Sequence, residues 1–263
     1  MTCIIAGKCR DGVVLIGDRK TVDKETQHVS YNEKISSDYY PIVFASSGST
    51  IQYGNFKRDA LFALQPSIKF QCSSENDTDI KYTPRASGAV NTYVTDFNPK
   101  EILSHDNSVK LFSYIKTLQT TVRQLRQENK LDFDVLFCTQ TSDRGSVIHF
   151  LDINGTPEDI NQFKIIGDGE KLVLMFVSPL WNTNIIMNEF ALIGYFTIKY
   201  IDKFELHNGI GLGGDRPQVW FIPNEGPLLR DRDCPQLIDS FEYNTNKMLQ
   251  NFKKDGLNLF LKC

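Results

Sequence analysis

Four residues near the start of the chain combine the groups needed to attack a carbonyl: Thr2, Asp18, Lys34 and Gly48. Thr2 follows the initiator methionine, so removal of Met1 would leave a hydroxyl and an α-amino group on one residue. An α-amino group has a pKa of about 8, and it can therefore act as a base near neutral pH. Thr2 would then supply both a nucleophile and its base.

The other three residues are of the types that would assist such a nucleophile. A nearby ammonium lowers the pKa of an amine because like charges disfavour protonation, and Lys34 is the candidate for that charge. Asp18 would pair with Lys34 and fix its position. The backbone N–H of Gly48 would stabilise an oxyanion. Each residue alone has an ordinary explanation, as a turn carboxylate or a solvated strand charge, so the hypothesis depends on the set.

Short strands must bring these residues together. An Asp-Gly pair at residues 11–12 between two apolar runs predicts a β-hairpin. We expect four strands before any helix: residues 3–9, 13–17, 29–35 and 42–45. A helix is then predicted up to about residue 64, with Ser49 or Thr50 as its N-cap.

The rest of the chain alternates between blocks of strands and helices. Apolar residues spaced by three and four predict a helix over residues 108–130, and residues 66–107, rich in turn residues, are interpreted as an inserted excursion. Further strands are expected at residues 133–139, 146–153, 163–167 and 171–177, and further helices at 188–204 and 235–254. Blocks of this kind favour an α+β fold with antiparallel sheets and helices stacked outside them.

Composition excludes several classes of protein. The 263 residues carry a net charge of −3, which argues against a nucleic-acid-binding surface. The six cysteines have no metal-ligand or disulfide-framework spacing: Cys3, Cys9, Cys72, Cys138, Cys234 and Cys263. Cys3 is expected in the core. No apolar run is long enough for a membrane helix, and no signal peptide is evident, so we expect a cytoplasmic protein without metal, cofactor, nucleic-acid or membrane partners.

Five segments together resemble a known family. TCIIAGKCRDGVVLIGDRK, NEKI and FASSG resemble the opening of proteasome β-type subunits, which are N-terminal nucleophile (Ntn) hydrolases, in the order Thr, Asp, Lys, Gly. IIGDG at residues 165–169 resembles the family's Gly-Ser-Gly segment, and GLGGDRPQVWFIPNEG at 211–226 resembles its Gly-Gly ending. The resemblance implies a four-layer αββα sandwich of two antiparallel sheets over residues 2–226, followed by a C-terminal helical extension over residues 227–263.

The resemblance also implies roles for individual residues. Thr2 would be nucleophile and base, Asp18 and Lys34 the tuning pair, and Gly48 the oxyanion donor. Asp168 stands where the family usually has a serine, and it would hold the amino group by a hydrogen bond while tending to raise its pKa. The family's later Asp and Ser fall on Glu205 and Asn208 in an alignment without a gap, although the chain then has extra residues before its Gly-Gly pair.

Three functions fit this set of residues. The first is a threonine-type peptidase that forms an acyl-enzyme on Thr2 and releases it with water. The second is a transpeptidase or protein ligase, in which an amine takes the acyl group. The third is a non-catalytic scaffold subunit of the same fold, favoured if Met1 is retained. The expected partners are a peptide or protein substrate and, from the resemblance, further copies in an oligomer or ring.

Overall fold

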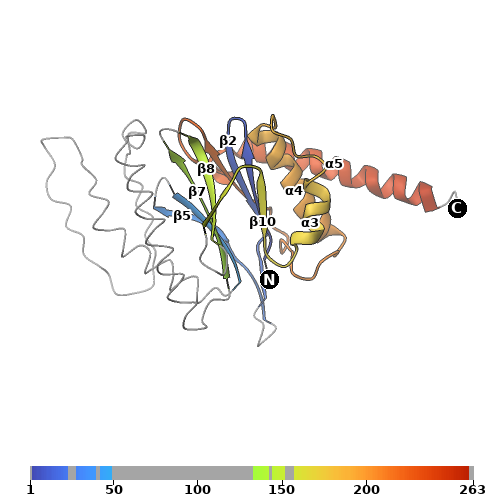
Figure 1. Cartoon of the computed structure of the whole chain (residues 1–263). Coiled ribbons are helices and arrows are strands. Elements are labelled where there is room, and N and C mark those ends of the chain that lie inside the picture. The colour runs from blue at the N-terminus through green and yellow to red at the C-terminus, as the bar shows by residue number, and fades with distance from the viewer. Residues whose placement is uncertain are drawn as a thin grey trace, which may run out of the picture.

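The computed structural model describes residues 2–22, 28–39, 42–48, 133–141, 144–151 and 157–260. In these residues the protein is a mixed α+β structure with two five-stranded antiparallel sheets and three α-helices (Figure 1). The predicted helices that end near residue 64 and span 108–130, and the predicted excursion at 66–107, lie outside the described residues.

The first sheet contains the predicted N-terminal hairpin. Its strands, in spatial order, are β10 (Phe163–Ile166), β1 (Ile4–Cys9), β2 (Gly12–Gly17), β11 (Gln218–Pro223) and β12 (Leu229–Arg230). Cys9 pairs with Gly12 across the Asp-Gly turn, and Ile4 pairs with Gly17 at the far end. The hairpin prediction is therefore confirmed.

The second sheet has the strand order β5 (Ile35–Tyr39), β6 (Ile42–Gly48), β7 (Phe133–Thr141), β8 (Gly145–Leu151) and β9 (Pro157–Ile160). β3 (Lys20–Val22) and β4 (Val29–Tyr31) form a separate two-stranded ribbon. The single strand predicted over 29–35 is therefore divided between β4 and β5. β3 and β9 were not predicted.

Helices α3 (Glu170–Val177), α4 (Met187–Lys203) and α5 (Pro235–Phe260) all follow the strands of the second sheet, and a short 3-10 helix, η1 (Asp231–Asp233), precedes α5. The prediction of helices at 188–204 and 235–254 is confirmed, and α5 continues to Phe260. The strand predicted at 171–177 is wrong, because this segment is α3. Val173 and Val177 are buried four residues apart, whereas Met175 is 73% exposed, so the run has the one-sided burial of a helix.

Two apolar clusters hold three layers together. One lies between the sheets and includes Ile4, Leu15, Ile35 and Leu136. The other lies between the first sheet and the helices, and it includes Ile5 and Ile16 of the sheet, Phe190 of α4 and Ile238 of α5. Cys3 is fully buried in this second cluster, as predicted. Figure 1 shows α3, α4 and α5 gathered on one side of the sheets.

Part of the predicted C-terminal extension belongs to these layers. β12 pairs with β11, so that Trp220 lies opposite Arg230. α5 packs against α4, where Tyr195 donates a hydrogen bond of 2.6 Å to Glu242. The segment after residue 226 is thus attached both to the first sheet and to the helical layer.

Candidate active site

Strand register brings the predicted site residues to one end of the first sheet. Ile4 of β1 lies between Gly17 of β2 and Ile166 of β10. Thr2 lies two residues before Ile4, and Asp18 directly follows the last residue of β2. The strand pairing therefore places Thr2 and Asp18 side by side, although sixteen positions separate them in the sequence.

Asp18 is fully buried. Its carboxylate accepts four hydrogen bonds, which favour the negatively charged form. Its Oδ1 accepts from the backbone N–H of Cys3 at 2.8 Å and from Nζ of Lys34 at 2.6 Å. Its Oδ2 accepts from the N–H groups of Lys20 at 3.2 Å and Gly211 at 3.3 Å. Because Cys3 is bonded to Thr2, the carboxylate is fixed directly beside the proposed nucleophile.

Lys34 reaches this carboxylate from the second sheet. Its side chain is 6% exposed, it directly precedes β5, and its Nζ also donates to the carbonyl oxygen of Lys20. Burial lowers the pKa of Lys34, while the attraction of Asp18 opposes that change. Burial likewise raises the pKa of Asp18, opposed by Lys34 and by the N–H groups of Cys3 and Gly211. Each charge therefore depends on the other to remain in the interior.

The family-like segment IIGDG meets Thr2 directly. Gly167 has a φ of +106°, and a Cβ placed on it would lie 1.8 Å from the carbonyl oxygen of Thr2. Only glycine tolerates both this backbone conformation and this approach. Asp168 follows, with an exposed side chain whose charge raises the pKa of Lys34, so it lies at the same end of the sheet.

Gly48 occupies the last position of β6. Ile35 pairs with Ala45 in the antiparallel β5–β6 pair, so the start of β5 and the end of β6 lie together. Lys34 and Gly48 are therefore at the same end of the second sheet. Gly48 has a φ of +104°. This turn out of the strand is a conformation that glycine adopts without strain.

Gln218 belongs to this site, and sequence reasoning missed it. The residue is 3% exposed and pairs with Gly17 in the first sheet. Its Oε1 accepts from the backbone N–H groups of Lys34 and Ile35, both at 3.0 Å, and its Nε2 donates to the carbonyl oxygen of Ile35 at 2.6 Å. In the sequence it is one polar residue at the start of an apolar strand, which carries no signal of this contact.

Glu205 and Asn208, the positions suggested by the ungapped alignment, both have exposed side chains. Asp202, one turn earlier, contacts the site segment instead: its Oδ1 accepts from the N–H of Leu212 at 3.1 Å. Leu212 follows Gly211, whose N–H binds Asp18.

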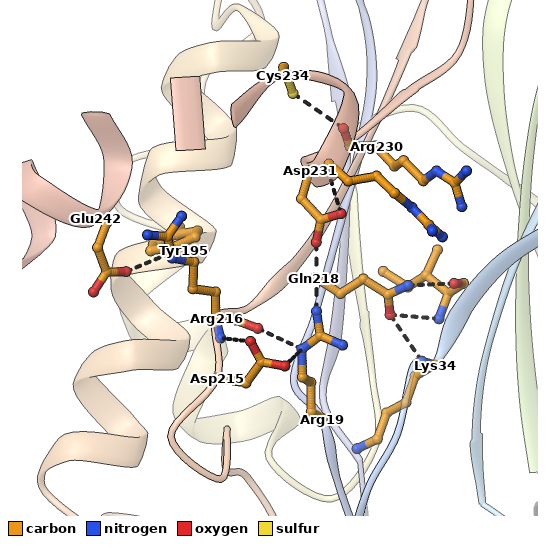
Figure 2. A network of polar contacts seen from close by, with 12 residues as sticks. Arg19, Lys34, Tyr195, Asp215, Arg216, Gln218, Arg230, Asp231, Cys234 and Glu242 are labelled. Atoms are coloured by element: carbon orange, nitrogen blue, oxygen red, sulfur yellow. Dashed lines mark hydrogen bonds and ion pairs between the residues drawn. The ribbon is translucent and has the colours of Figure 1, made fainter. Parts of the chain in front are cut away.

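A second polar network centres on Arg19, the residue that follows Asp18 in the sequence (Figure 2). The Nε of Arg19 donates to the carbonyl oxygen of Arg216 at 2.8 Å and lies 3.3 Å from Oδ2 of Asp215. One NH2 group of Arg19 lies 3.7 Å from Oδ2 of Asp231 in η1. Arg19 thereby joins the end of β2 to the Gly-Gly loop and to the segment that leads into α5.

The described ranges contain no group of three or more His, Cys, Asp or Glu side chains arranged to hold a metal ion. Among the helices of these ranges, none combines the length and apolar character required to span a bilayer. No protein-family model matches the chain, and no curated protein is significantly similar to it.

Proposed function

We propose that the protein is a threonine-type peptidase of the Ntn hydrolase class, similar to proteasome β-subunits, with Thr2 as its nucleophile after removal of Met1. The observation that carries this proposal is the buried ion pair between Asp18 and Lys34, whose Nζ and Oδ1 are 2.6 Å apart. Residues from two sheets and four separate backbone segments contact this pair, which lies beside Thr2. Together, the three side chains are of the types that attack on a peptide carbonyl by an N-terminal threonine needs.

The arrangement of the layers supports the finer assignment of a four-layer αββα sandwich. Helices cover one face of the first sheet, and the two sheets pack face to face. The second sheet is buried on both faces: Ala45 and Leu136 face the first sheet, whereas Phe44 and Phe137 alternate with them and are also at most 1% exposed. A sheet in the middle of a layered sandwich has this double burial.

The proposed reaction begins when Oγ1 of Thr2 attacks the carbonyl carbon of a peptide bond. The α-amino group of Thr2 takes the hydroxyl proton, and the Gly48 N–H stabilises the oxyanion. The amine proton then passes to the leaving nitrogen as the C–N bond breaks, leaving an ester on Thr2. Water hydrolyses this ester and regenerates the hydroxyl.

The ion pair has two tasks in this scheme. The ammonium of Lys34 favours the neutral form of the Thr2 amine, because a second positive charge nearby is unfavourable. Asp18 fixes that ammonium and, through the N–H of Cys3, fixes the backbone next to the nucleophile. Asp168 adds a negative charge at the exposed edge, which would oppose the lowering of the amine pKa.

Intact-mass measurement combined with a peptide epoxyketone tests the proposal. This probe forms a ring with a hydroxyl and a free amine on the same residue, so we expect one adduct on Thr2 of protein that has lost Met1. Thr2→Ala should fold and remain unlabelled. Labelling of Thr2→Ala, or no labelling of wild-type protein that lacks Met1, would refute the assignment.

The same preparation separates the related functions. Protein that retains Met1 in mature form would support the non-catalytic scaffold, because the amine would then lie one residue away from the hydroxyl. Incubation with two different peptides distinguishes hydrolysis from ligation by mass spectrometry, since only a ligase yields a recombined product. We expect cleavage products alone.

A further inference from the structure

We propose that Gln218 is a positioning residue that holds Lys34 in place beside Thr2, an inference that rests on the proposed function. The side-chain amide of Gln218 forms three hydrogen bonds with the backbone of Lys34 and Ile35, at 3.0, 3.0 and 2.6 Å. A side chain of the first sheet thus bonds to backbone groups at the start of the second sheet, in the way that a neighbouring strand would.

The position of Gln218 explains why it acts on the ammonium of Lys34. Gln218 pairs with Gly17, the last residue of β2, and Asp18 directly follows Gly17. Neighbouring strands of the first sheet therefore hold Lys34 at two points, with Gln218 on its backbone N–H and Asp18 on its Nζ. A lysine side chain has four flexible methylenes, so fixing only its charged end would leave its backbone free to move.

The chemistry of the contact requires an amide. Its oxygen accepts two N–H groups while its nitrogen donates to a carbonyl, and these are the three polar groups at the start of β5. An apolar replacement of similar length leaves all three without a partner in a buried place. A carboxylic acid reproduces the pattern only while protonated, because a carboxylate has no donor for the Ile35 carbonyl.

The chain offers a matched control in Gln140. This glutamine is 7% exposed, and its Nε2 also connects the second sheet to the first, donating to the carbonyl oxygens of Pro223 at 2.7 Å and Gly226 at 2.8 Å. Pro223 pairs with Gly12, whereas Gln218 pairs with Gly17 at the other end of β2. Gln140 therefore makes the same kind of contact away from Thr2.

The experiment compares Gln218→Met and Gln218→Glu with Gln140→Met. The primary measurement is the titration of the Lys34 Nζ by NMR of protein labelled with ¹³C,¹⁵N-lysine, with the signal assigned from Lys34→Arg. Burial is the main cause that lowers the pKa of Lys34. Gln218→Met should move that pKa up towards its ordinary value as the start of β5 loosens, and Gln140→Met should leave it unchanged.

Labelling of Thr2 by the epoxyketone is the second measurement. We expect Gln218→Met to slow labelling by about tenfold, and Gln140→Met to change it by less than about twofold. Gln218→Glu should label at nearly the wild-type rate at low pH and fall behind the wild type as its carboxyl loses its proton. This variant also keeps the test decisive if Gln218→Met does not fold.

An unchanged Lys34 titration in the Gln218 variants, or an equal change in Gln140→Met, would overturn the inference. If wild-type protein that lacks Met1 is not labelled, the proposed function fails, yet the Lys34 titration still decides the role of Gln218. The two failures are therefore distinguishable.

Discussion

Replacing Asp18 with Asn removes one charge of the buried pair and keeps the shape of the side chain. Lys34 then retains an ammonium with 6% of its side chain exposed, and the two oxygens nearest to it, the new amide oxygen and the Lys20 carbonyl, carry no full charge. Removing one partner of a buried ion pair costs about 3–5 kcal/mol. This loss of stability has an upper limit, because Lys34 can lose its proton instead of remaining as a buried ammonium. From an ordinary pKa of 10.5, removing that proton costs about 5 kcal/mol at pH 7 and about 2 kcal/mol at pH 9.

The sign of the pH dependence follows from this limit. In Asp18→Asn the unfolded state binds a proton on Lys34 that the folded state holds less tightly, so stability rises with pH up to the ordinary lysine pKa. Denaturant unfolding of both proteins should therefore show a difference in the free energy of unfolding that is about 3–5 kcal/mol at pH 7 and smaller at pH 9. Comparing the two proteins at each pH cancels the titration of all other groups.

Asp239→Asn serves as the control for removal of a surface charge pair. Asp239 and Arg216 are 64% and 46% exposed, with 2.8 Å between their charged atoms. Such pairs contribute about 0–1 kcal/mol, so this variant should lose little stability at either pH. The reasoning would be refuted if Asp18→Asn lost as little unfolding free energy as the control, or if its loss were no smaller at pH 9 than at pH 7. Either result would mean that the variant does not leave an unpaired, buried ammonium on Lys34.

Two further predictions concern Gly167 and His149. Gly167→Ala should cost more stability than Gly214→Ala and should also slow labelling of Thr2. Both glycines have a positive φ, a conformation that costs other residues about 1–2 kcal/mol. Of the two, only Gly167 has a neighbour, Thr2, in the place of the new Cβ. Equal losses measured by denaturant unfolding would contradict this contact. Burial lowers the pKa of His149, whose Nδ1 lies 2.6 Å from Asp159, so the unfolded state takes up a proton first and wild-type stability should fall as pH drops below about 6.5. His149→Phe should weaken that acid dependence in the same assay, and an unchanged slope would exclude His149 as its source.

Local rules predicted the parts of the fold that local sequence controls. The Asp-Gly turn defined the first hairpin, and the apolar stripe of α4 defined its bounds within a residue at each end. α3 was mistaken for a strand because its apolar run has no polar residue to reveal a helical period. Packing of Val173 and Val177 against the core determined its structure, and that information lies in distant residues.

The sequence also predicted some residues of the candidate site and missed others. Asp18 and Lys34 were found because their residue types matched the chemistry proposed for Thr2, and the structure brings these two into an ion pair. Gln218, Asp202 and Arg19 were missed because each acts on a backbone group or a loop from far along the chain. No residue type or spacing within one segment records such a contact.

The long sequence separations in the site also bear on how the protein is made. Gly211 binds Asp18 from 193 residues away, and Gln218 binds Lys34 from 184 residues away. The ribosome must release the chain beyond residue 218 before these groups can enclose the ion pair. In a nascent chain the two charges face water, where they are worth little. The buried environment of Asp18 and Lys34 therefore forms only after residues 211 and 218 have been synthesised.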